Sequence, residues 1–222
     1  MIKVIFEDNH LLVVEKPVNI LSQGDDTTDL DMVNLLKKYL KEKYDKPGNV
    51  FVGLIHRLDR PVGGVMVFAK TSKCASRLSE QVRNKSIKKT YNAVINKSMK
   101  KDKDTLVDYL YKDKQTNMVR VVDKNHKESK DAKLNYKTIA KEKEFSLVEI
   151  DLITGRPHQI RVQFSSRGNS LFGDQRYSKT AKVGEQIALW SNKIEINHPI
   201  TKEKMIFESN VPNEYPWNLF KK

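Results

Sequence analysis

Apolar and polar residues alternate along much of the chain, which is typical of β-strands that bury one face. Two such runs near the start, residues 2–6 and 11–15, flank the polar turn Glu7-Asp8-Asn9-His10 and predict a hairpin. The alternation returns and predicts strands at residues 50–55, 65–69, 88–95, 105–111, 118–122, 134–140, 145–150 and 160–164, with further short strands near Ile187, Ile194 and Met205.

Two segments show the spacing of an amphipathic helix instead. Between residues 29 and 45, apolar side chains recur on one face, and Pro47-Gly48 ends the pattern. Thr71 or Ser72 provides the cap of a second helix that continues to about Asn84. The apolar side of this second helix is predicted to consist of Ala75, Leu78 and Val82.

Length and charge narrow the class of protein. A chain of 222 residues is long enough for one large domain with a real core. Its 41 Lys and Arg residues outnumber 28 Asp and Glu residues, which gives a net charge of +13 that is spread along the sequence. This excess favours a polyanionic partner, with nucleic acid ahead of an acidic membrane surface. The alternative is a protein that is simply solvated by lysine.

Several classes of protein are disfavoured by what the sequence lacks. The single cysteine, Cys74, excludes an internal disulfide and is expected to be core packing. The start does not resemble a signal peptide, and no apolar run approaches the roughly 20 residues that span a bilayer. We therefore expect a cytoplasmic protein that is not anchored in a membrane. The scattered histidines and the absence of a P-loop or dinucleotide fingerprint predict no metal and no organic cofactor.

The most unusual stretch is residues 54–64, in which three charges lie between two apolar runs. Asp59 is flanked by Arg57 and Arg60 at the mouth of a predicted turn, and charges so close to a core are expected to be paired or functional. A neighbouring guanidinium favours the ionised carboxylate, which keeps it available as a nucleophile or base. Asp59 is therefore the first candidate for chemistry.

Two further segments carry candidate site residues. Arg156, His158, Gln159 and Arg161 lie within six positions and could hold a carboxylate or a phosphate. Tyr91 begins a predicted strand, where a tyrosine is as often half-buried core as part of a site. Arginines and an aromatic ring are the residue types that would hold a nucleotide extruded from a helix.

These segments, taken in order, resemble the RluA-type RNA pseudouridine synthases. The stretch 56–60 with Gly64 is similar to the central motif of this family, 89–91 to its second motif and 154–162 to its third. The opening residues 7–17 resemble the first strands of the family, and residues 173–177 resemble a late loop. Several segments in the right order make the resemblance specific, and it covers nearly the whole chain.

The resemblance implies an α+β fold with a large, mixed but mainly antiparallel sheet, flanked by helices and loops. Residues 1–222 are then one catalytic domain without the separate N-terminal RNA-binding module that is frequent in the family. The expected reaction is isomerisation of uridine to pseudouridine in structured RNA, ribosomal or transfer RNA, by a monomer without metal or cofactor. The alternatives are a catalytically silent RNA-binding or ribosome-assembly protein on the same fold and, with less support, a nuclease.

The resemblance also implies roles for individual residues. Asp59 corresponds to the catalytic aspartate, which acts at the sugar of the uridine while the N1–C1′ bond is cleaved, and Arg161 to the arginine that pairs with it. Tyr91 corresponds to the tyrosine that stacks on the base, and Arg57 is a candidate to fill the space left by the flipped base. Predicted RNA contacts are His56, Arg60, Lys89, Arg156, His158 and Gln159.

The chain departs from the family pattern at three places. Val62-Gly63-Gly64 stands where a Thr-Ser-Gly sequence is common, so we expect different support of the turn with activity retained. Pro157 replaces a common threonine and Gln163 a common histidine, which puts RNA contacts near the third motif in question.

Overall fold

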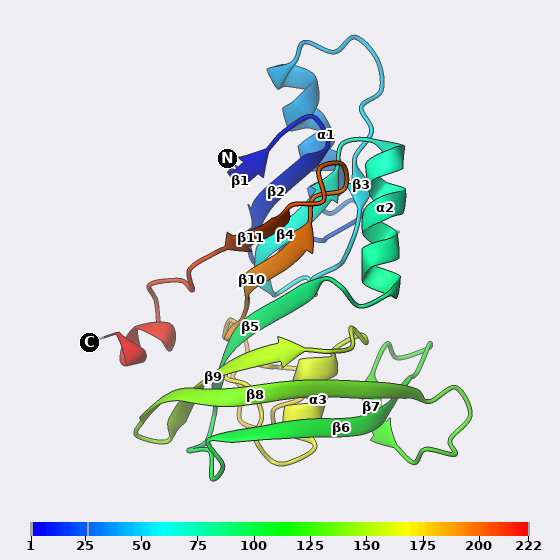
Figure 1. The fold of residues 1–222 in the computed structure, drawn as a ribbon. Coiled ribbons are helices and arrows are strands. Elements are labelled where there is room, and N and C mark those ends of the chain that lie inside the picture. The colour runs from blue at the N-terminus through cyan, green and yellow to red at the C-terminus, as the bar shows by residue number, and fades with distance from the viewer. Residues whose placement is uncertain (1, 26, 222) are drawn as a thin grey trace. The chain divides into compact units, whose positions relative to one another are not determined.

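The computed structural model describes residues 2–25 and 27–221, and they divide into two compact units (Figure 1). The first unit contains residues up to Lys88 together with Ser191–Asn210, and the second contains Lys89–Trp190 together with Val211–Lys222. Each unit is thus assembled from two separate stretches of the chain. Nothing in the alternation of the sequence indicates this division, and the single catalytic domain over residues 1–222 stays a prediction.

The first unit is built on antiparallel strands. The predicted hairpin is confirmed as β1 (Lys3–Glu7) and β2 (Leu11–Lys16). β2 pairs with β4 (Gly63–Ala69), in which every residue is buried. The remaining strands are β3 (Gly53–Leu54), which also pairs with β4, and β10 (Leu189–Asn197), which pairs with β11 (Lys204–Glu208). The strand predicted over residues 50–55 is therefore reduced to two residues.

Both predicted helices form in the first unit. α1 (Met32–Lys43) begins after Asp31, whose carboxylate accepts a hydrogen bond from the Asn34 backbone N–H. α2 (Ser72–Arg83) begins in the same way after Thr71 and packs against β3 and β4. Cys74 and Leu78 are fully buried there, whereas Val82, near the end of the helix, is 38% exposed. Burial also raises the pKa of the Cys74 thiol to about 12, as expected for core packing.

The strands of the second unit lie in the order β5-β9-β8-β6-β7, with antiparallel pairing throughout. Their bounds are β5 (Lys88–Ile95), β6 (Lys103–Lys112), β7 (Val119–Val122), β8 (Lys130–Glu142) and β9 (Phe145–Leu152). All five were predicted, β5 with the same limits. A short 3-10 helix, η1 (Trp217–Phe220), contacts β8.

The strand predicted over residues 160–164 is wrong, because this segment forms helix α3 (Gln159–Ser165) against β6 and β7. Ile160, Val162 and Phe164 alternate with Arg161 and Gln163, which imitates a strand with one polar face. In the structure the first six residues of α3 are all buried, and the two polar side chains find partners inside the protein. Periodicity fails to distinguish a helix from a strand when every side is buried.

The predicted α+β class with a mainly antiparallel sheet and flanking helices is confirmed. One smaller expectation fails, because Ile187 is buried but lies outside any strand. Within the part of the chain that the structure describes, no helix has the length and apolar character needed to cross a membrane.

Candidate active site

Asp59 lies in a loop of the first unit between β3 and β4. Arg57 is exposed, Leu58 is buried and Asp59 is partly exposed, so the apolar residue anchors the loop while its charged neighbours face outward. The backbone N–H of Val62 donates to the carbonyl of Asp59 at 2.9 Å and closes a tight turn. The turn thus presents the carboxylate from a segment with a fixed backbone.

The buried side chain of Lys16 supports this loop by donating hydrogen bonds to its backbone carbonyls. Although Lys16 is fully buried, its ammonium donates to the backbone carbonyls of Pro17 at 2.8 Å, Arg60 at 3.1 Å and Val62 at 2.8 Å. Burial lowers the pKa of Lys16 to about 7; the charge of Asp59 raises it, and the charge of Arg60 lowers it further. Sequence reasoning missed this residue, and the available signal was a lysine that directly follows an apolar strand and precedes a proline.

Two more contacts from the N-terminal segment fix the same loop. The hydroxyl of Ser22 donates to the carbonyl of Leu58 at 2.7 Å and accepts from the Leu58 N–H at 3.0 Å. The Asn19 N–H donates to the Arg60 carbonyl at 2.8 Å. These bonds satisfy backbone groups that would otherwise be costly to bury. The loop is therefore ordered before any substrate arrives, which is what positioning of a reacting group requires.

Several predicted residues around Asp59 have structural partners. Nε2 of His56 accepts a hydrogen bond from the Val67 N–H at 3.1 Å, and the ring is buried, so it supports the start of the loop. The guanidinium of Arg60 pairs with Asp29 at 2.7 Å and stays half exposed. Gly64 has φ +116°, and a Cβ there would lie 2.2 Å from the carbonyl oxygen of Ser191, so the return into β4 requires glycine.

In the second unit, α3 positions Arg161 inside the protein. Its guanidinium makes a bidentate pair with the buried carboxylate of Asp174, at 3.0 Å from Nε and 2.7 Å from a terminal nitrogen. It also lies over the ring of Tyr177, 5.2 Å from the centroid. The Tyr177 hydroxyl in turn lies 2.7 Å from Nδ1 of His158. Residues 173–177, which resembled a late loop of the family, thus fix the orientation of Arg161.

Gln159 organises the turn that precedes α3. Its amide oxygen accepts from the Thr154 hydroxyl at 2.8 Å and the Arg156 N–H at 3.0 Å. Its amide nitrogen donates to the Lys133 carbonyl at 3.1 Å and to Gln163 at 3.0 Å. All four hydrogen-bonding positions of the amide are used within the protein, which argues against the predicted RNA contact of Gln159. Gln163 is itself fully buried, so its difference from the family pattern changes packing inside the protein.

The other predicted residues of the second unit lie on β5 and on the same turn. Tyr91 is a largely buried residue of β5, opposite Ile150 of β9. Burial lowers the pKa of Lys89, whose ammonium is so close to Gly155 that a Cβ there would lie 3.2 Å from Nζ. Arg156 pairs with Asp131. His158 adopts a left-handed conformation with φ +51° immediately before α3.

The structure therefore brings the predicted residues together in two groups. The first unit gathers His56, Arg57, Asp59 and Arg60 on one loop, and the second gathers Arg156, His158, Gln159 and Arg161 at the start of α3. Asp59 belongs to one unit while Tyr91 and Arg161 belong to the other, so their meeting in one site stays a prediction. Among the described residues, no three His, Cys, Asp or Glu side chains are grouped as they would be around a metal ion.

Comparison with known proteins identifies the family. A family model described as RNA pseudouridylate synthase matches residues 10–166. The chain belongs to this family. It is an RNA pseudouridine synthase, an isomerase that acts on uridine in RNA, as the resemblance implied.

Relatives and solved structures agree with this membership. An RNA pseudouridine synthase of Bacillus subtilis, YhcT, is 33% identical over 94% of this chain and 68% of its own length. The ribosomal large subunit pseudouridine synthase D of Zymomonas mobilis is 30% identical over 96% of this chain and 70% of its own length. Human RNA pseudouridylate synthase domain containing 4 shares the fold, with a TM-score of 0.79 and 20% identity over 95% of this chain and 88% of its own.

Proposed function

We propose that the chain converts specific uridines of structured RNA to pseudouridine, with ribosomal RNA as the first candidate substrate and transfer RNA as the second. Relatives about 30% identical are named as synthases of the ribosomal large subunit. The net charge of +13 supports a polyanionic substrate. The family membership establishes the reaction, and the proposal concerns the substrate and the residues that act on it.

Asp59 is the proposed catalytic residue and acts at the sugar of the target uridine. The N1–C1′ bond breaks, the base turns, and a C5–C1′ bond forms, while C5 loses a proton and N1 gains one. Atoms and electrons balance within the nucleotide, so the reaction consumes no second substrate. The observation that carries this proposal is the loop around Asp59, whose carbonyls are held by the buried ammonium of Lys16. Such a fixed backbone suits a residue that must meet one atom of its substrate.

A uridine in a paired helix must leave the stack before its sugar is accessible. Arg57 is the proposed residue that fills the gap, and its exposed position beside the buried Leu58 supports this role. Tyr91 is proposed to contact the extruded base and Arg161 to pair with Asp59. Phosphate contacts are assigned to Arg60, Lys89, Arg156 and His158, whereas the internal hydrogen bonds of His56 and Gln159 favour supporting roles.

The experiment that tests this proposal replaces Asp59 by Asn, which keeps the shape of the side chain and removes its charge. Pseudouridine formation in ribosomal RNA transcripts should fall below detection, while affinity for the same RNA stays within about twofold, because phosphate binding requires no carboxylate at this point. Asp45→Asn is the matched control, since Asp45 is exposed and has a left-handed backbone that asparagine also tolerates.

Pseudouridine can be measured by chemical derivatisation of the RNA followed by primer extension. Full turnover in the Asp59→Asn protein would refute the catalytic assignment. A wild-type protein that binds ribosomal and transfer RNA but modifies neither would favour the silent RNA-binding alternative.

A further inference from the structure

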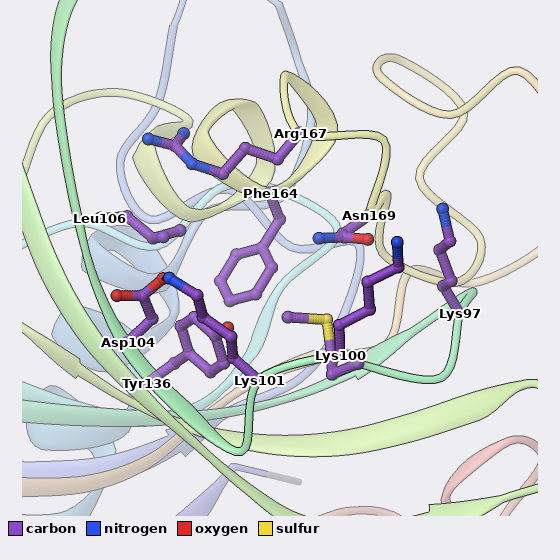
Figure 2. A pocket seen from close by; sticks show the side chains of 10 residues that line it. Lys97, Lys100, Lys101, Asp104, Leu106, Tyr136, Phe164, Arg167 and Asn169 are labelled. Carbon is purple, nitrogen blue, oxygen red and sulfur yellow. The ribbon is translucent and has the colours of Figure 1, made fainter.

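The second unit has a pocket that none of the predicted site residues lines. It has a volume of about 280 Å³, slightly below the roughly 300–1,000 Å³ usual for ligand pockets. Its walls come from the segment after β5, from β6 and β8, and from the end of α3 (Figure 2). The lining residues are Lys97, Met99, Lys100, Lys101, Asp104, Leu106, Tyr136, Phe164, Arg167 and Asn169.

The rim of this pocket is strongly basic. Four cationic side chains face a single carboxylate, that of Asp104, which pairs with Lys101 at 2.8 Å. Arg167 is held from outside the pocket by Asp108, at 2.8 and 3.0 Å. Lys97 and Lys100 are exposed, and neither forms an ion pair with any residue of 2–25 or 27–221. The rim therefore keeps two positive charges that no described carboxylate pairs with.

The floor of the pocket is apolar. Figure 2 shows the ring of Phe164 at the centre of the pocket, and the centroids of the Phe164 and Tyr136 rings are 5.3 Å apart. Tyr136 and Phe164 are 6% and 1% exposed, and Met99 and Leu106 are similarly buried. Asn169 adds an amide at the side of the cavity. A ligand that fits must present a flat, weakly polar group to this floor and negative charge to the rim.

We propose that this pocket holds one unpaired nucleotide of the RNA, with its base on the apolar floor and its flanking phosphates on Lys97 and Lys100. An acidic peptide or a membrane would use the charge but not the recessed floor. A base-paired nucleotide keeps its faces stacked inside the helix, so only a single-stranded segment can enter. The pocket would thus be a second contact with RNA, which rests on the proposed function and restricts the substrate to an RNA that has an unpaired nucleotide in addition to the target uridine.

The direct test observes Met99, which lines the pocket, in protein with ¹³C-labelled methionine methyl groups. Hexauridylate should shift the Met99 resonance in a saturable way and leave that of Met205, on β11 of the other unit, unchanged. Lys97→Ala/Lys100→Ala should weaken binding of hexauridylate about tenfold, since two phosphate contacts are lost. Lys124→Ala/Lys127→Ala is the matched control, because these lysines are equally exposed and lie in a loop outside the pocket.

A duplex with the same number of phosphates separates base recognition from charge. The wild type should bind hexauridylate more tightly than this duplex, and the Lys97/Lys100 variant should lose more affinity for the single strand. An unmoved Met99 resonance at saturating hexauridylate, or equal losses for the pocket variant and its control, would overturn the proposal. Neither readout depends on turnover, so failure of pseudouridine formation with an intact Met99 shift would refute the proposed function and leave the pocket standing.

Discussion

Lys16 supports the loop that carries Asp59, and Gln159 supports the turn that precedes α3; both are buried polar side chains with several hydrogen bonds, but they differ in chemistry. Lys16 offers only donors and satisfies three backbone carbonyls of its unit. Gln159 offers donors and acceptors and satisfies groups of both kinds. One loop is thus fixed by a charge and the other by a neutral amide.

This chemical difference predicts that burying the Lys16 side chain costs more free energy than burying the Gln159 side chain. A buried ammonium loses its hydration and regains only part of that free energy from carbonyl dipoles, which is why burial lowers the pKa of Lys16 to about 7. An amide with four partners has no such penalty. The Asp59 loop should therefore respond to pH, and the Gln159 turn should not. We interpret the buried Lys16 ammonium as a costly support that serves the Asp59 carboxylate, which acts at the substrate in the proposed mechanism.

The largest effect is expected from Lys16→Met, which keeps the apolar stem and removes the ammonium. Buried carbonyls that lose their donor cost about 1–3 kcal/mol each, so the free energy of unfolding should fall by about 3 kcal/mol in urea titrations. Turnover should fall about 100-fold through displacement of Asp59. Lys73→Met, at an exposed position of α2, is the control for the added methionine. Unchanged stability and turnover in the Lys16→Met protein would refute the claim that Lys16 supports the Asp59 loop.

A smaller effect is expected from Gln159→Leu. Four hydrogen bonds disappear, but Thr154 still bonds Lys133, and Arg156 still pairs with Asp131, so we expect a loss of about 2 kcal/mol and a smaller loss of turnover. Gln159→Glu sharpens the comparison, since an ionised carboxylate has no donor for the Lys133 carbonyl and should make this turn sensitive to pH. A Gln159→Leu protein that is less stable than the Lys16→Met protein would contradict the expected order of the two stability losses.

The smallest effect, taken per pH unit, is the pH dependence of stability. The folded protein releases the Lys16 proton near pH 7, whereas the unfolded chain retains it to about 10.5. Between these values the unfolded state binds more protons, so the contribution of Lys16 to the free energy of unfolding rises with pH, by about 1 kcal/mol per unit. The gain is complete above 10.5 and lost as pH falls to 7. Urea titrations from pH 7 to 10 should show this rise in the wild type relative to Lys16→Met, and parallel curves would contradict it.

Much of the fold could be read from local patterns. The hairpin, both capped helices and the strand Lys88–Ile95 follow from side-chain period and capping residues, which act over a few positions. The segment 160–164 was misread because Arg161 and Gln163 are polar yet buried, which only their partners Asp174 and Asp108 make possible. The motif residues were found from their order along the chain, whereas the supporting roles of His56 and Gln159 depend on hydrogen bonds that only the folded chain forms.

Motif order and periodicity along the chain were enough to indicate the family, the α+β class and the residues that are candidates for chemistry. The packing of the folded chain was needed to show that Lys16 is the buried support of the Asp59 loop and that Lys97, Lys100 and Phe164 border one pocket. These relations include residues far apart in the sequence, such as Lys16 with Val62 and Phe164 with Lys100. Burial and charge pairing at such distances depend on how the chain packs, and a local pattern carries no record of that packing.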